Sequence, residues 1–388
     1  MASEWTTIRA ADFIEFNPRL SIKKNAIATK VAMDKLQPFT KKIPATEQAE
    51  FAGGSKFCNG DTIMARITPC LENGKTAFVD VLQNGEVGFG STEFIVMRAR
   101  DGISDPQFIY YLATSPTFRN VAIKSMVGSS GRQRVQQGVL DDLELVVPPL
   151  DDQQKIGAFL ALFDEKIALN NKINDNLQQQ AFALFDKLIT TPHPESVALS
   201  EIAELNPKRS LDKNRMARCI DMAQLSTSGS FPNGWEIKPY NGGMRFANGD
   251  TLFARITPCL ENGKTAYIDF LDADEVAFGS TEYIVMCSQG QYPSEFFYCL
   301  ARYPSFVDYA VKNMNGSSGR QRVSAETIGK YILPRITDDE LAEFRDVVPA
   351  LFSAIRLNSF ENISLAELRD VLLPKLMSDE IDVSDIQI

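Results

Sequence analysis

"GDTIMARITPCLENGKTAFVD", residues Gly60–Asp80, returns as "GDTLFARITPCLENGKTAYID" at Gly249–Asp269, with 17 of the 21 positions identical. Other stretches repeat at the same spacing of 188 or 189 residues: "FGSTEFIVM" at Phe89–Met97 as "FGSTEYIVM" at Phe278–Met286, and "GSSGRQRV" at Gly128–Val135 unchanged at Gly316–Val323. Such a period is too long for a solenoid. The chain is therefore a tandem duplication of one large unit.

The first part of each unit is a globular block of short strands and turns. "TIMARI" alternates in the manner of a strand, with Ile63, Ala65 and Ile67 on one face and Thr62, Met64 and Arg66 on the other. "TAFVDV" and "EFIVM" predict further strands, and Asp105-Pro106 opens a helix through "DPQFIYYLATSPTFRNVAI". "LVVPPL" closes the block, because its two prolines stop a strand.

The second part of each unit is a long helix. Asp151–Ile189 and Asp338–Leu376 carry apolar residues near heptad spacing. About 38 residues at about 1.5 Å each make a rod of roughly 57 Å, and Pro374 marks where the second rod ends or kinks. Neither rod can bury its stripe alone, so we expect an antiparallel coiled coil. Two unrelated helices, each packed on its own block, are the alternative.

These patterns predict the fold class and the domain organisation. We expect two α/β (α+β) globular domains, separated by two long helices and related by a pseudo-two-fold internal duplication. The predicted boundaries are 1–150 for the first domain, 151–190 for the first spacer helix, 191–336 for the second domain, and 337–388 for the second spacer helix and tail. In the helix seam we expect Ile167, Asn170, Asn174, Leu177, Ile355, Asn358, Asn362 and Leu365.

The net charge of −10 is unevenly spread over the 388 residues. Residues 337–388 hold 4 Lys+Arg against 12 Asp+Glu, whereas 1–150 (17 against 16) and 191–336 (15 against 16) are near neutral. Any nucleic-acid surface must then be a local cluster. No apolar run reaches the roughly 18 residues of a membrane helix, and the start lacks the pattern of a secretory signal. We therefore expect a cytoplasmic protein with no membrane contact.

Catalytic motifs are not found in the sequence. "ENGKTA" ends like a phosphate-binding loop, but Pro69 replaces the glycine required five positions before Gly74. Six scattered cysteines and one histidine, His193, give neither a metal site nor a Ser-His-Asp triad. We expect His193 to be a linker residue. The chain is predicted to be a binding protein without metal, cofactor or enzymatic activity of its own.

The order of these features resembles the DNA-specificity subunit of type I restriction-modification systems. The most specific parts are the "VPPLDDQQ" hinge at Val147–Gln154 with its helix, and "LRDVLLPKLMSDEIDV" at Leu368–Val383. The resemblance implies that each block is a target-recognition domain reading one half of a split double-stranded DNA sequence. It implies that the helices set the spacer length and dock methyltransferase subunits, which we expect to number two. S-adenosylmethionine and ATP would then belong to methyltransferase and restriction subunits.

Candidate DNA-contacting residues follow from the side chains that read DNA. Arg, Lys, Asn or Gln on short loops reach the grooves, and small residues allow close backbone approach. The candidates are Arg66, Asn73, Lys75, Ser129, Ser130, Arg132, Gln133 and Arg134, with Arg255, Asn262, Lys264, Ser317, Ser318, Arg320, Gln321 and Arg322 in the second copy. The alternative is that these loops brace each block, with their arginines paired to Asp or Glu.

The near-identity of these loops predicts two similar half-sites that form nearly an inverted repeat. Differences between half-sites should then lie in the divergent stretches, 37–52 against 226–241 and 98–127 against 287–315. Two other classes of function compete with this hypothesis. One is a non-enzymatic two-fold scaffold bridging two protein partners without DNA recognition, and the other is an enzyme with an unrecognised site.

Overall fold

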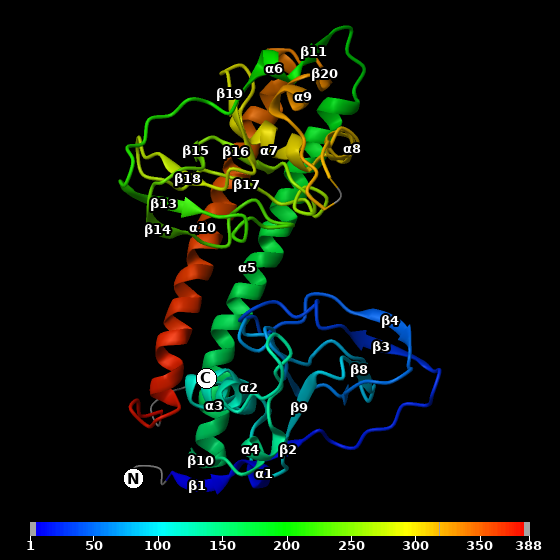
Figure 1. Ribbon diagram of the computed structural model, residues 1–388, viewed down its shortest axis with the longest axis vertical. Helices are drawn as coiled ribbons and strands as arrows, with labels where there is room; N and C mark the ends of the chain where they lie inside the picture. The colour runs from blue at the N-terminus through cyan, green and yellow to red at the C-terminus, as the bar shows by residue number, and fades with distance from the viewer. Residues whose placement is uncertain (1–4, 318, 384–388) are drawn as a thin grey trace. The chain divides into compact units, whose positions relative to one another are not determined.

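The computed structural model describes residues 5–317 and 319–383 (Figure 1). The chain divides into two compact units. Unit 1 runs up to Ala168 and resumes at Asn362, and unit 2 is Leu169–Glu361. Each unit thus holds one globular block and part of both long helices. The four-segment boundaries expected from the sequence stay a prediction.

Unit 1 is built on two four-stranded sheets. One has the order β2-β9-β6-β7 and is antiparallel, the other has the order β4-β3-β8-β5, and β1 pairs with β10 separately. The strands are β1 (Thr6–Arg9), β2 (Ile14–Phe16), β3 (Ile27–Val31), β4 (Glu47–Glu50), β5 (Lys56–Phe57), β6 (Thr62–Ala65), β7 (Thr76–Phe78), β8 (Gly88–Gly90), β9 (Phe94–Ala99) and β10 (Glu144–Val147). As predicted, β10 ends immediately before Pro148.

Strand β6 separates two hydrophobic cores. Ile63 belongs to one cluster of buried side chains and Met64 to another, and all four residues of β6 are buried. Ile63 and Met64 thus belong to different cores, but Ala65, which was expected on the Ile63 face, belongs to the same cluster as Met64.

The helices of the block differ from the prediction at one point. The segment after Asp105 forms two helices, α2 (Pro106–Thr114) and α3 (Pro116–Lys124), and the single helix expected there is wrong. Ser115 ends the first helix in an extended conformation, and its side chain caps the second by accepting a hydrogen bond from the Phe118 amide. Pro116 then occupies the first helical position, where its missing N–H has no cost. Two short helices complete the block, α1 (Ala10–Phe13) and α4 (Gln137–Asp141).

Unit 2 repeats this topology strand for strand. Its sheets have the orders β12-β19-β16-β17 and β14-β13-β18-β15, and β11 pairs with β20. The strands are β11 (Ser196–Ala198), β12 (Ala203–Leu205), β13 (Met216–Ile220), β14 (Glu236–Pro239), β15 (Met244–Phe246), β16 (Thr251–Ala254), β17 (Thr265–Tyr267), β18 (Ala277–Gly279), β19 (Tyr283–Ser288) and β20 (Ile332–Pro334), and the helices are α6 (Leu199–Ile202), α7 (Ser294–Arg302), α8 (Pro304–Lys312) and α9 (Ala325–Gly329). The duplication read from the sequence is thus a duplication of fold.

One buried carboxylate is neutralised differently in the two copies. Asp61, 2% exposed, forms a two-point ion pair with Arg98 of β9, with both N–O distances 2.7 Å. Its counterpart Asp250, 0% exposed, is paired instead with Arg209, at 2.6 and 2.7 Å. The position of Arg98 holds Cys287 in the second copy, and the position of Arg209 holds Leu20 in the first. The copies therefore reach the same charge balance with arginines from different segments.

Two long helices run as the heptad spacing predicts: α5 is Leu150–Thr190 and α10 is Asp338–Leu376. In unit 2, Asn170 donates to Glu361 at 2.7 Å, Asn358 donates to Asn174 at 2.8 Å, and Lys187 donates to Glu343 at 2.7 Å. The partner's number on α10 falls as the number on α5 rises. The two segments are therefore antiparallel, as predicted.

The seam between the helices is partly polar. Asn170 and Ile355 are buried, and Ile167, Asn174, Leu177, Asn358, Asn362 and Leu365 are half-buried. Each helix also starts on its own block, because Ile156 and Leu160 join the core of unit 1, and Leu341 and Phe344 join that of unit 2. Helix pairing and packing on the block, posed as alternatives by the sequence, occur together. Helix α10 also continues through Pro349.

Within the described residues, no helix combines the length and the apolar character needed to cross a membrane.

Candidate nucleic-acid interface

The described residues of the repeated octapeptide have the same backbone features in both copies. Val127 and Arg134 form an isolated β-bridge that closes the first loop, and Asn315 and Arg322 close the second. Gly131 and Gly319 have φ values of +78° and +77°, in the left-handed region that glycine adopts without strain. The loop is thus a small hairpin-like projection, and its shape is determined by its own glycines and by the backbone hydrogen bonds of the bridge.

The last arginine of each octapeptide braces the loop. Arg134 donates three hydrogen bonds of 2.6 to 3.0 Å to the Glu93 carboxylate, and Arg322 repeats this on Glu282. The hydrogen bond from Arg134, and its charge, lower the pKa of Glu93 below its usual range. This is the bracing arrangement that the sequence offered as the alternative. Contact of these two arginines with DNA stays a prediction.

The tip of each loop is open to solvent. Arg132 and Arg320 are exposed, and their guanidinium groups have no hydrogen bond or ion pair with any residue that the structure describes. Ser129, Ser130 and Ser317 are exposed beside them, Gln133 and Gln321 are half-buried, and Ser318 lies outside the described residues. Arg132 and Arg320 are therefore the members of the octapeptide best placed to reach a partner.

The loop between β6 and β7, and its counterpart between β16 and β17, each carry a candidate lysine and a candidate asparagine. The lysine side chains bond to the block, and the asparagine side chains face solvent. Lys75 donates to the Met33 carbonyl at 2.9 Å, and Lys264 to the Met222 carbonyl at 2.7 Å. Both lysines therefore hold their loops to the block. Asn73 and Asn262, in contrast, are exposed. Their contact with DNA stays a prediction.

Arg66 and Arg255 follow β6 and β16 and are half-buried. Arg66 donates through Nη2 to the Val135 carbonyl at 3.1 Å, which ties it to the end of the octapeptide. The Nε atoms of both arginines are buried and have no hydrogen-bond partner among the described residues. The two predicted loops and this arginine thus meet in one region of each unit.

A polar hollow of about 400 Å³ adjoins Arg66 in unit 1. It is lined by Asn17, Pro18, Arg19, Leu20, Gly54, Ser55, Lys56, Arg66, Thr92, Phe94 and Val96. Arg19 and Lys56 were missed by the reasoning from sequence. For Arg19 the sequence did carry a signal, because the repeated stretches "NPRLSIKK" (17–24) and "NPKRSLDK" (206–213) both keep their basic residues.

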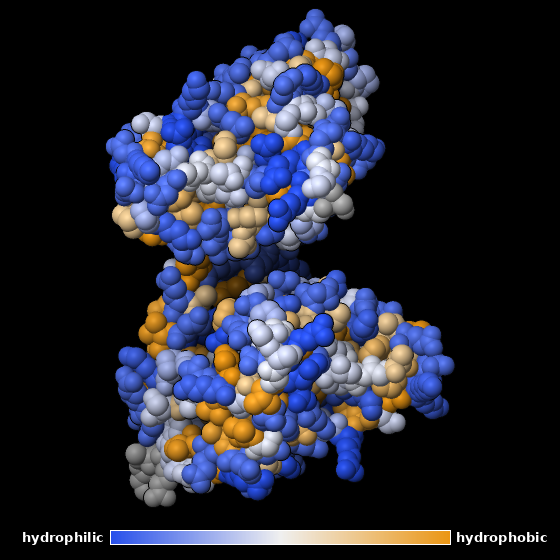
Figure 2. All heavy atoms as spheres, viewed as in Figure 1, coloured by the Kyte–Doolittle hydropathy of each residue, from blue (hydrophilic) through white to orange (hydrophobic). Residues whose placement is uncertain are grey.

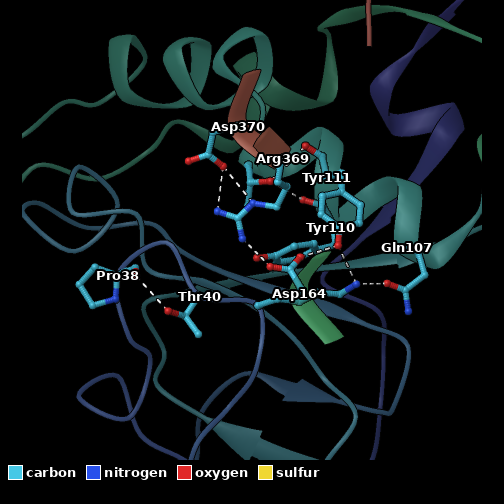
Figure 3. A network of polar contacts seen from close by, with 10 residues as sticks. Pro38, Thr40, Gln107, Tyr110, Tyr111, Asp164, Arg369 and Asp370 are labelled. Carbon is cyan, nitrogen blue, oxygen red and sulfur yellow. Dashed lines mark hydrogen bonds and ion pairs between the residues drawn. The ribbon is translucent and has the colours of Figure 1, made fainter. Parts of the chain in front are cut away.

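A second polar cluster in unit 1 is closed to solvent. Figure 3 shows Gln107, Tyr111, Asp164 and Arg369 converging from α2, α5 and α10. Arg369 pairs with Asp164, Tyr111 donates to the other Asp164 oxygen at 2.5 Å, and Lys41 donates to Gln107 and to Tyr111. Burial lowers the pKa of Lys41 to about 8, against the opposing charge of Asp164. The cluster ties both helices to the block.

The histidine of the linker has a structural contact. His193 Nε2 lies 2.8 Å from the Leu188 carbonyl in the last turn of α5, and Nδ1 lies 3.4 Å from Glu340. A hollow of about 310 Å³ beside it is lined by Lys187, Glu340 and Glu343, among others. In the described part of the chain, no three His, Cys, Asp or Glu side chains gather as a metal site requires.

Comparisons with known proteins agree with this geometry. A family model described as the type I restriction modification DNA specificity domain matches residues 2–179. The HindI type I restriction enzyme specificity subunit of Haemophilus influenzae is 25% identical over 83% of this chain and 86% of its own length. The EcoAI specificity subunit of Escherichia coli is 28% identical over 47% of this chain, which spans 30% of that protein. The crystal structure of a type I restriction-modification system S subunit from M. genitalium has the same fold, with a TM-score of 0.57 at 16% identity over 96% of both chains.

Proposed function

We propose that this chain, which is similar to the specificity subunits of type I restriction-modification systems, is the subunit that reads the DNA target for its complex. Each unit would read one half of a split double-stranded sequence. The observation that carries the proposal is the repeated loop tip, Arg132 in one copy and Arg320 in the other, exposed on two blocks of identical topology. A bidentate contact from arginine or lysine to guanine is the commonest specific contact in the major groove.

The methyl transfer and the DNA cleavage would belong to other subunits. In this proposal the chain is not an enzyme, and S-adenosylmethionine and ATP bind to the methyltransferase and restriction subunits. Figure 2 shows hydrophobic side chains on the surface over α10, where Leu357 is 64% exposed, Leu368 53% and Val371 58%. Exposed apolar side chains on a helix favour a protein partner, and we expect two methyltransferase subunits to dock on the helices. A DNA-reading subunit needs access to the chromosome, so we propose a cytoplasmic location.

The two half-sites should be similar. The loops that carry the exposed arginines and asparagines have the same sequence in both copies, so we propose a target close to an inverted repeat. Any difference between the half-sites would come from the divergent stretches, 37–52 against 226–241 and 98–127 against 287–315.

Mapping of methylated adenines across a genome tests this function. Cells that hold the methyltransferase subunit are compared with and without the chain. A split motif that appears only with the chain supports the specificity role, and comparison of its halves tests the inverted repeat. Unchanged methylation, with retained binding to protein partners, would support a scaffold instead.

A further inference from the structure

We propose that the polar hollow beside Arg66 is a seat for one phosphate of the DNA backbone, and that the matching residues of unit 2 hold a second phosphate. The inference rests on the proposed function and deepens it. It assigns to the hollow the sequence-independent part of DNA binding, which positions a protein on the duplex. The exposed loop tips would then carry the reading of bases.

The walls of the hollow are fixed by the backbone. Asn17 has a φ of +48°, and its side chain accepts a hydrogen bond from the Val96 amide at 3.0 Å, which pins the turn before Pro18 to β9. On the opposite side, Gly54 has a φ of +122°, and a Cβ there would lie 2.0 Å from the Gly90 carbonyl oxygen. Ser55 donates to the Phe94 carbonyl at 3.0 Å. The segments that carry the charged side chains are therefore rigidly placed.

Three cations face this space, and each has donors to spare. Lys56 uses one of its three protons on the Leu20 carbonyl at 2.7 Å and lies 5.7 Å from the centre of the Phe51 ring. Arg66 uses Nη2 on Val135, and Arg19 is exposed with no partner among the described residues. A lysine ammonium has three N–H donors and an arginine guanidinium has five. A phosphate oxygen would therefore find free donors there.

The neighbouring carboxylates do not cancel this charge. None of the described residues that line the hollow is Asp or Glu. Glu93 forms its ion pair with Arg134 and also interacts with the charge of Arg66, but this single carboxylate leaves the charges of Arg19 and Lys56 uncompensated. Asp61 is engaged by Arg98. The hollow therefore keeps a net positive charge, which an anion would compensate.

The comparison of the two copies favours a phosphate contact over a contact to a base. Arg19 is matched by Lys208, Lys56 by Arg245, Arg66 by Arg255 and Thr92 by Thr281. At two of the three cationic positions the residue has changed between Arg and Lys while the charge has been kept. A bidentate or stacked contact is sensitive to that exchange, because the flat guanidinium fork and the ammonium differ in geometry. A phosphate contact tolerates either arginine or lysine, because the contribution of such a contact to binding is largely electrostatic.

Salt dependence of DNA binding tests the proposal. The assembled complex with its methyltransferase subunits is titrated with cognate and with scrambled duplex at several salt concentrations between roughly 50 and 200 mM. For Lys56→Gln we expect both affinities to fall by the same factor, about 5- to 10-fold. The slope of log affinity against log salt should shrink by about 0.9, the value for one phosphate. Lys56→Arg should restore both, because unit 2 has arginine at this position.

Lys30→Gln provides the matched control. Lys30 is also half-buried on a strand of unit 1 and pairs with Glu47, but its counterpart is Cys219, so its charge is not kept between the copies. We expect Lys30→Gln to leave the slope unchanged. An unchanged slope for Lys56→Gln, a loss confined to cognate duplex, or an equal loss for Lys30→Gln would each overturn the proposal.

The source of the phosphate is tested separately. If inorganic phosphate at constant ionic strength raises the unfolding temperature of the wild-type complex without DNA, and Lys56→Gln removes that effect while the DNA slope is unchanged, the site serves free phosphate and the DNA proposal fails. Failure of the proposed function would look different. The wild-type complex would then show no preference for any duplex, before any variant is tested.

Discussion

At the scale of single residues, the buried aspartate predicts a rescue of stability, because its arginine partner comes from different positions in the two units. Arg98→Cys leaves the buried Asp61 carboxylate unpaired, and breaking a buried pair in this way should cost about 3 kcal/mol of unfolding free energy in unit 1. Adding Leu20→Arg recreates the arrangement of unit 2 and should recover most of the loss. Denaturant unfolding of the two single variants and of the double variant measures this. Additive effects in the double variant would contradict the prediction.

Lys41 predicts a pH dependence of stability. Burial lowers its pKa from 10.5 to about 8 in the folded chain, so between these values the unfolded state binds more protons. The free energy of unfolding should therefore rise with pH in this window, by about 3 kcal/mol in total, and the cost of burying the charge should be constant below pH 8.

Denaturant unfolding of the wild-type chain and of Lys41→Met, from about pH 7 to 10.5, measures the effect. The difference between the two curves removes the contributions of other titrating groups, including the buried tyrosines. A difference that does not change with pH would show that Lys41 is not the group responsible.

At the scale of elements, the long helices could be predicted from sequence and the polar cluster that holds them could not. Heptad spacing of apolar residues placed both helices to within a residue or two. Nothing in the sequence indicated that Asp164 and Arg369 form a buried pair, because 205 residues separate them and charged residues on a helix are usually solvated. The break at Ser115-Pro116 was readable, since serine before proline is a helix-start signal.

The second copy suggests how to replace that cluster. The positions of Asp164 and Arg369 correspond to Phe352 and Ala181 in unit 2, where the core is apolar. Arg369→Ala alone leaves a buried carboxylate and should cost about 3–5 kcal/mol. Asp164→Phe combined with Arg369→Ala should be clearly more stable than Arg369→Ala alone. Chemical denaturation of both variants checks this, and equal stability would indicate that Tyr111 and Lys41 need the carboxylate.

At the scale of the whole molecule, the duplication made the topology of the second unit predictable from the first. The candidate interface was less predictable. The repeated loops were found, but the inward direction of Lys75 and the pairing of Arg134 depend on which partners the fold brings close. The sequence did not predict that Arg19 and Lys56 belong to one site, because they are far apart in the chain and only the fold brings them to one hollow.

Two units that read separate half-sites predict separable effects. Arg132→Gln should relax the base preference in one half of the methylated motif by about 1–3 kcal/mol and leave the other half intact, and Arg320→Gln should do the converse. Methylation mapping with each variant measures this. Relaxation of both halves by either change would mean that the two units do not read independently.

The exchanged ion pair also constrains the history of the duplicated halves. Two identical copies once shared one solution for the buried aspartate, and one copy has since moved to the other. A path through a chain with neither arginine would pass through an unstable ancestor. A path that gains the second arginine before it loses the first avoids this loss of stability, because the carboxylate then keeps a partner at every step.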